Sequence, residues 1–203
     1  MHSRYVDWDE AVAVFRERGL PESFYENLYN EGYALISGDT TVAGDFRLTG
    51  EVPHDATGYI IDGDLTVEGN VYDEDDGAAA LVVLGNLRAR DVFLWCDPKL
   101  LVLGDTEVGV FAGEMTDKLV MLGGDLRTRA VLLDAEFEPD LVEGTISGRL
   151  VAPSYCELET EDPNPSLPLR DLLVNEVLKG DEVDFEALRE RVRDGLPVTR
   201  AAA

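Results

Sequence analysis

The chain has 203 residues, of which 45% are hydrophobic and 29% are charged, a balance that suits one globular domain with a sizeable core. Its 42 Asp and Glu residues against 17 Lys and Arg residues give a formal net charge of -25 at pH 7. Nucleic acids and anionic membrane surfaces bind clustered Lys and Arg, so this charge argues against both as partners and favours a cationic partner, or no partner beyond water.

The start of the chain and its cysteines bear on its location. Acidic residues interrupt the N-terminal sequence from Asp7 onwards, so we expect no secretory signal peptide. The sequence has no apolar run of about 18 residues, so we expect no membrane-spanning helix. Cys96 and Cys156 lack the spacing of a metal site or a disulfide framework, and we expect both to be core residues. These features predict a cytoplasmic protein.

Residues 1–32 predict a helical N-terminal cap. A first helix is expected over 7–18, with Asp7 as its cap and Gly19 as its stop, and a second helix is expected before Gly32. Aromatic residues at helical spacing are more often packing residues than a ligand site. We therefore expect these helices to cover the first coil of the repeat that follows.

Residues 33–152 contain a repeated segment. In each copy an apolar run is followed by Gly, then by Asp or Asn, and then by a strand in which apolar and polar residues alternate. The copies lie at 60–67, 82–89, 101–108 and 120–128. Five glycines, from Gly44 to Gly124, are separated by 19, 22, 19 and 20 residues. Such a period is typical of a β-solenoid coil, so we predict a mainly β fold, a short parallel, right-handed β-solenoid of about six three-strand coils.

Glycine followed by Asp or Asn predicts a corner between two strands. Glycine accepts positive φ, and Asp and Asn side chains bond to neighbouring backbone groups. The turn alone explains these residues, so we expect a structural role for them. The predicted corner residues are Gly44, Gly63, Gly85, Gly104, Gly124, Asp64, Asn86, Asp105 and Asp125.

The alternating strand predicts two outward columns of side chains on successive coils. In the first column Arg88 and Arg127 flank Glu107, which predicts a ladder of alternating charge. In the second column Arg90 is expected opposite Glu68. A salt-bridged surface explains these arginines better than a phosphate site does, because the interleaved glutamates and the net charge oppose phosphate binding.

The first strand of each coil is apolar at every position, as in 81–84 and 100–103. Such strands are normally covered on both faces, so a terminal helix or a second subunit is expected against this wall. Residues 153–168 are acidic and proline-rich, which indicates an extended connection. Residues 169–203 predict a C-terminal helical segment whose apolar faces are candidates to cover the wall.

The sequence offers little for catalysis. The only histidines are His2 and His54, and no phosphate-binding glycine loop is present. Ser147 lies in a segment that superficially resembles a nucleophile elbow, but it falls where another corner is expected. We therefore expect no enzyme and no cofactor.

The densest acidic sequence is the run Asp73-Glu74-Asp75-Asp76. Its spacing does not match a calcium-binding loop, so a solvated loop is favoured over a metal site. A loop that binds a partner is a further alternative.

Three features carry a resemblance to bacterial proteins: the repeated coils, the Arg-x-Arg motifs at 88–90 and 127–129, and the tail at 178–198. Together they resemble a group of bacterial β-solenoid proteins, some of which resemble immunity proteins that accompany polymorphic toxins. The chain is also similar to bactofilins, which are polymer-forming β-helical scaffolds.

The first resemblance implies a non-catalytic cytosolic protein that neutralises a basic toxin, because an acidic surface speeds association with a basic one. Contacts to the toxin are then expected from Asp73, Glu74, Asp75, Asp76, Glu157, Glu159, Glu161 and Asp162. The second resemblance implies instead a scaffold that self-associates into homo-oligomers. Helices at both ends of the solenoid are expected to block end-to-end stacking of such a scaffold.

Overall fold

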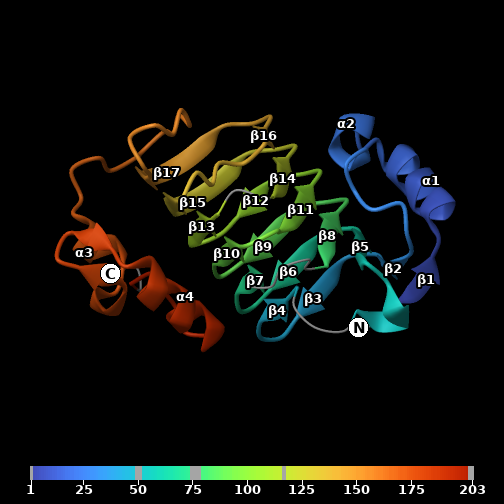
Figure 1. Cartoon of the computed structure of the whole chain (residues 1–203), viewed down its shortest axis with the longest axis horizontal. Helices are drawn as coiled ribbons and strands as arrows, with labels where there is room; N and C mark the ends of the chain where they lie inside the picture. The colour runs from blue at the N-terminus through green and yellow to red at the C-terminus, as the bar shows by residue number, and fades with distance from the viewer. Residues whose placement is uncertain (1, 49–51, 74–78, 116–117, 201–203) are drawn as a thin grey trace.

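The computed structural model describes residues 2–48, 52–73, 79–115 and 118–200 (Figure 1). Parallel strands stack into a β-solenoid of about four turns, and short helical segments lie beside it. The predicted fold class, a mainly β protein built as a parallel β-solenoid, is therefore confirmed.

The first strands of the coils form one seven-stranded sheet. In sheet order its strands are β1 (Arg4–Val6), β2 (Tyr33–Ser37), β5 (Gly58–Asp62), β8 (Ala80–Val83), β11 (Lys99–Val102), β14 (Leu119–Leu122) and β16 (Leu141–Val142). All neighbours pair in parallel except β1, which pairs antiparallel with β2. This pairing fixes the N-terminal segment to the first coil.

The second and third strands of the coils form a ten-stranded sheet that folds back on itself. Its order is β3 (Thr40–Val42), β6 (Leu65–Val67), β9 (Leu87–Ala89), β12 (Thr106–Glu107), β15 (Leu126–Asp134), β13 (Val110–Glu114), β10 (Val92–Trp95), β7 (Val71–Asp73) and β4 (Phe46–Arg47), with β17 (Ile146–Val151) paired to β15. The long strand β15 joins both walls, and the pairing register between β15 and β17 shifts between Arg127 and Ala130.

The main core lies inside the coils. The alternating second strand sends Leu65, Leu87 and Leu126 inward, and all three are fully buried there, as predicted. Thr106 occupies the same column between Leu87 and Leu126, and it is also fully buried. A polar hydroxyl therefore interrupts an otherwise apolar stack.

The corner residues form a ladder along one edge of the solenoid, here called the first corner. In each rung a side-chain oxygen accepts the backbone N–H of the equivalent residue one coil later. The accepting residues and donor-acceptor distances are Asp39 to Asp64 (2.9 Å), Asp64 to Asn86 (2.7 Å), Asn86 to Asp105 (2.9 Å), Asp105 to Asp125 (3.0 Å) and Asp125 to Thr145 (2.9 Å). The structural role predicted for these residues is what the geometry shows.

The reason that the first corner needs glycine differs from the prediction. Gly63, Gly85, Gly104 and Gly124 do not have positive φ. Instead, a Cβ at Gly85, Gly104 or Gly124 would lie 2.4–2.5 Å from the side-chain oxygen of the corner residue one coil earlier. Close stacking of successive coils, rather than an unusual backbone angle, therefore excludes side chains here.

The prediction placed Gly44 in the wrong corner. Gly44 has a φ of 95° and stacks beneath Gly69, in what we call the second corner. The first-corner position of that coil belongs to Gly38, which stacks beneath Gly63. The regular spacing of glycines concealed this difference, because the first corner rung spans 25 residues, from Asp39 to Asp64.

The N-terminal segment covers the outer face of the seven-stranded sheet (Figure 1). Helix α1 (Trp8–Arg18) begins at Asp7, whose side chain accepts the N–H of Glu10 at 2.9 Å, and ends at Gly19 with a φ of 77°. The second predicted helix is a single turn, α2 (Glu22–Tyr25).

Apolar contacts hold this segment in place. Phe15 and Phe24 are fully buried in one cluster with Val82 and Leu101 of the sheet. The predicted cap over the first coil is thus a cover along several coils, and the apolar wall of first strands is covered by this segment.

The C-terminal segment covers the opposite flank, over β7, β10, β13 and β15 (Figure 1). It consists of α3 (Leu169–Leu172), the 3-10 turn η2 (Asn175–Val177), the hairpin β18 (Leu178–Lys179) and β19 (Glu182–Val183), and α4 (Phe185–Arg193). The prediction that these residues cover the first-strand wall was wrong. They pack instead on the outer face of the third strands, where Phe93 and Val110 meet Leu188 and Val192.

Candidate functional site

The acidic run predicted to bind a partner is only partly described. Asp73 is the last residue of β7 and is fully buried, so its side chain is not presented to a partner. Glu74, Asp75 and Asp76 lie outside the described residues. The run therefore contributes no described contact surface.

The second acidic segment lies beside the last coil. The backbone of Glu161 donates to the carbonyl O of Ile146 at 2.7 Å and accepts the N–H of Gly148 at 2.9 Å, so this segment continues the sheet beyond β17. Asp162 forms an ion pair with Arg149, which neutralises its charge. Glu157, Glu159 and Glu161 stay exposed, and the last two line a shallow hollow of about 360 Å³.

The outward arginine columns are engaged within the fold. Arg88 pairs with Glu107 at 3.2 Å, as predicted. Arg127 pairs instead with Asp105 and Asp125 of the first corner, both at 2.6 Å. The bond from Arg127 to Asp105 holds the pKa of Asp105 below its usual value.

The second column does not form the predicted pair with Glu68. Arg90 donates to Asn70 Oδ1 at 2.9 Å and to the carbonyl O of Gly195 at 2.7 Å. Its guanidinium joins the solenoid to the C-terminal tail, so this column does not offer a phosphate site either.

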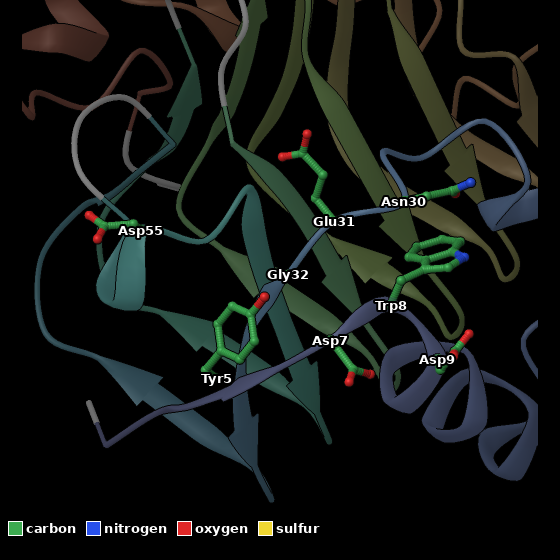
Figure 2. Close-up of a pocket in the computed structure, with 8 residues that line it drawn as sticks. All are labelled: Tyr5, Asp7, Trp8, Asp9, Asn30, Glu31, Gly32 and Asp55. Carbon is green, nitrogen blue, oxygen red and sulfur yellow. The ribbon is translucent and has the colours of Figure 1, made fainter.

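A larger hollow of about 540 Å³ lies where the N-terminal segment meets the first coil (Figure 2). We call it the acidic hollow. Its lining comes from the junction of β1 and α1, from the turn before β2 and from the 3-10 turn η1 (Pro53–Asp55). The lining residues are Tyr5, Asp7, Trp8, Asp9, Asn30, Glu31, Gly32 and Asp55.

Strand pairing brings these three segments together. Val6 of β1 lies opposite Tyr33 of β2, so Tyr5 is placed beside the turn that precedes β2. The ring of Tyr5 lies over Gly32, and a Cβ at Gly32 would come within 2.1 Å of that ring. Gly32 is therefore what allows an aromatic wall at this point.

The second aromatic wall is Trp8, on the other side of Gly32 (Figure 2). Its ring contacts Phe15 and Tyr25 edge to face, each with a centroid distance of 6.3 Å, and lies 6.0 Å from Tyr33. These contacts anchor Trp8 in the cluster beneath α1, so this wall is rigid.

Four carboxylates surround the aromatic pair: Asp7, Asp9, Glu31 and Asp55. Asp7 also caps α1. Within the described ranges none of the four is paired with a cationic side chain. Acidic side chains and aromatic faces both attract cations, so the acidic hollow favours a cationic group.

Among the described residues, no three His, Cys, Asp or Glu side chains gather closely enough to hold a metal ion. The nearby His54 ring lies 3.2 Å from the carbonyl O of Ser3 and 3.3 Å from its hydroxyl. The arrangement suits recognition of a guanidinium or ammonium group.

The acidic hollow was missed in the sequence, where Trp8 and its neighbours were interpreted as packing residues and Asp7 only as a cap. Both interpretations are correct, but neither considers that the same residues also line a hollow at the surface. The available signal was the closeness of acidic and aromatic residues at 5–9 and at 29–31.

No protein-family model, curated protein or solved structure matches this chain. No helix in the described part of the chain is long and apolar enough to cross a membrane. The binding chemistry is therefore inferred from the site itself.

Proposed function

We propose that the protein is a non-catalytic, acidic binding protein that holds basic side chains of a protein partner in the acidic hollow, and that this partner is a bacterial toxin neutralised in the cytoplasm. The observation that carries the proposal is the hollow itself, in which four carboxylates surround two aromatic rings. The choice of a toxin as the partner comes from the resemblance of the coils, the Arg-x-Arg motifs and the tail to bacterial β-solenoid proteins, some of which resemble immunity proteins.

Long-range and short-range electrostatics act together in this proposal. A formal net charge of -25 attracts a basic protein from a distance and raises its association rate. At the hollow, a guanidinium stacked on Trp8 or Tyr5 gains about 0.5–2 kcal/mol from the aromatic face. Charge therefore supplies attraction, and the aromatic walls supply the preferred point of attachment.

The predicted acidic contacts lie outside the hollow in this proposal. Glu157, Glu159 and Glu161 are exposed near the far end of the solenoid, and Glu74 to Asp76 remain predicted contacts. Exposed charges away from the point of attachment mainly change association rates, so we assign these residues steering rather than affinity.

The test measures binding of a fluorescent oligo-arginine peptide by anisotropy at two salt concentrations. The triple variant Asp9→Asn, Glu31→Gln, Asp55→Asn is expected to weaken binding about tenfold, because it removes the charges around the aromatic pair. The control variant Glu17→Gln, Glu22→Gln, Glu26→Gln removes the same number of charges from exposed positions in α1, in α2 and just after α2. We expect it to weaken binding only about twofold. Equal losses in the two variants would overturn the assignment of the hollow.

A scaffold that self-associates is the second candidate. Strands β3 and β4 are the two ends of the ten-stranded sheet, and both belong to the first coil. The helical segments lie along the flanks rather than over this end, contrary to the predicted block (Figure 1). Unpaired strand edges promote association. Sedimentation velocity from low to high micromolar concentration tests this: filaments or a rising sedimentation coefficient would favour the scaffold, and a constant monomer would exclude it.

We also propose the number and the handedness of the coils. The six parallel strands in the seven-stranded sheet support six coils. The strong preference of parallel crossovers supports a right-handed coil.

A further inference from the structure

The two aromatic walls of the acidic hollow lie on opposite faces of the β1–β2 pair. Successive residues of a strand point to opposite faces, and residues directly opposite each other share a face. Tyr5 lies opposite Ala34, and Val6 lies opposite Tyr33, so Tyr5 and Tyr33 point to different faces. Trp8 packs near Tyr33, with ring centroids 6.0 Å apart. The rings of Tyr5 and Trp8 therefore lie on different faces (Figure 2).

One carboxylate accompanies the ring of Tyr5. Asp55 belongs to the turn η1. The residues on either side of η1, Val52 and Ala56, pack in one apolar cluster with Ala34. Ala34 shares its face with Tyr5, so η1 brings Asp55 to that face. We call Tyr5 and Asp55 the Tyr5 subsite.

Another carboxylate accompanies the ring of Trp8. Asp9 lies in the first turn of α1. Arg4 precedes Tyr5 in β1 and points to the other face, where it pairs with Glu10 of α1 at 2.6 Å. Helix α1 therefore brings Asp9 to the face of Trp8, and we call these two residues the Trp8 subsite.

The end of the strand pair separates the two subsites. Gly32 lies between the two rings in the hollow (Figure 2), and the ring of Tyr5 lies directly over it. A single guanidinium group cannot stack on both rings, because the backbone at Gly32 stands between them. The hollow, of about 540 Å³, is also larger than one such group occupies.

We infer that the acidic hollow binds two adjacent basic residues of an extended partner segment, one in the Tyr5 subsite and the other in the Trp8 subsite. This inference rests on the proposed function and names the segment that the hollow recognises. Successive side chains of an extended segment point in opposite directions, so neighbouring arginines that cross the end of the strand pair reach one subsite each. Two arginines separated by one residue point the same way, so they fill only one subsite.

Two fluorescent peptides of identical composition test this spacing. Both contain Gly, Ser and two arginines, which are adjacent in one peptide and separated by one serine in the other. Their net charges are equal, so long-range attraction cancels when their affinities are compared by anisotropy at one salt concentration. The adjacent pair is expected to bind about tenfold more tightly, because it gains the second aromatic contact.

A double variant removes one subsite. Tyr5→Leu with Asp55→Asn deletes a ring that is 51% exposed and an exposed carboxylate. The preference for adjacent arginines should then fall from about tenfold to about equal affinity, because only the Trp8 subsite remains. The matched control, Tyr155→Leu with Glu157→Gln, removes an exposed tyrosine and an exposed carboxylate near the far end of the solenoid and should keep the preference. Far-UV circular dichroism checks that both variants fold.

The outcomes separate the two subsites from the hollow itself. Equal affinities of the two peptides for the wild type, both lowered by the triple variant Asp9→Asn, Glu31→Gln, Asp55→Asn, would keep the hollow as a binding site but overturn the two subsites. A preference that persists in Tyr5→Leu with Asp55→Asn would also contradict them. Affinities that the triple variant leaves unchanged would overturn the proposed function and the subsites together.

Discussion

At the first corner of the solenoid, the bonds described for the Asp and Asn side chains stay within the stack, each to the next coil, whereas at the second corner Asn70, Arg90 and Asp91 also bond to the C-terminal segment at 192–198. The first corner is therefore held by bonds between successive coils, and the same arrangement repeats from coil to coil. The second varies along the stack, because it must match one particular segment of the chain. The difference shows that corner residues can either propagate a solenoid or attach something to it.

The largest expected effect comes from breaking the regular corner. Gly85→Ala places a Cβ 2.4 Å from Asp64 Oδ1 and should lower the free energy of unfolding by about 2–3 kcal/mol. Gly180→Ala is the control, because its φ of 73° is strained for alanine but no atom lies within 4 Å. It should cost only about 1 kcal/mol. Urea unfolding measures both changes, and a larger loss at Gly180 would contradict the stacking explanation.

The second effect separates the two outward columns of arginines. Arg90→Met removes the donor to Asn70 and Gly195 and leaves their partly buried oxygens unpaired, so it should lower the free energy of unfolding by about 2 kcal/mol. Arg88→Met removes only an exposed pair with Glu107 and should change the free energy by less than about 0.5 kcal/mol. Similar values in urea unfolding would mean that the bonds from Arg90 to the C-terminal segment add little to stability.

A smaller effect, in the stabilising direction, is expected inside the coils. The hydroxyl of Thr106 has no hydrogen-bond partner among the described residues, although the side chain is fully buried. Thr106→Val keeps the shape and removes this unpaired group, so it should raise the free energy of unfolding by about 1 kcal/mol. A decrease in the thermal midpoint would indicate that the hydroxyl has a role in the core.

The smallest effect concerns the titration of the first corner. Bonds from Arg127 are the main cause of the lowered pKa of Asp105, whereas the backbone N–H of Thr145 is the main cause of the lowered pKa of Asp125. Arg127→Met should therefore return the pKa of Asp105 toward its ordinary value and leave that of Asp125 lowered.

The pH range follows from the direction of these shifts. A lowered pKa stabilises the fold above the ordinary carboxyl value near pH 4, and this stabilisation is lost as pH falls through the lowered value. Carboxyl-carbon NMR titration from pH 2 to pH 6 measures each group. Equal shifts at Asp105 and Asp125 in the variant would contradict the separate causes.

The repeat could be predicted from the sequence because every coil needs the same residue types to stack on the next coil. Gly85, Gly104 and Gly124 leave room for the preceding side-chain oxygen, and the following Asp or Asn supplies the next one. The prediction assigned Gly44 to the wrong corner, because the first coil is longer and glycine also occurs at its second corner. Spacing alone does not distinguish two corners that use the same residue types.

It was harder to predict which terminal segment covers which wall of the solenoid, because the first and third strands are both apolar. Only the antiparallel pairing of β1 with β2, a contact between distant segments, assigns the N-terminal helices to one wall and leaves the other to α4. The acidic hollow depends on the same pairing, which brings Tyr5 to Gly32. Its residues carry no motif, so the sequence did not reveal it.

The central claim, that the acidic hollow holds basic side chains, is tested most directly by NMR titration of the isotope-labelled protein with an oligo-arginine peptide. The account predicts that the first signals to shift are those of Trp8, Asp9, Glu31 and Asp55, and that the indole N–H of Trp8 shifts with them. Shifts spread evenly over the exposed carboxylates, or confined to 157–162, would contradict it.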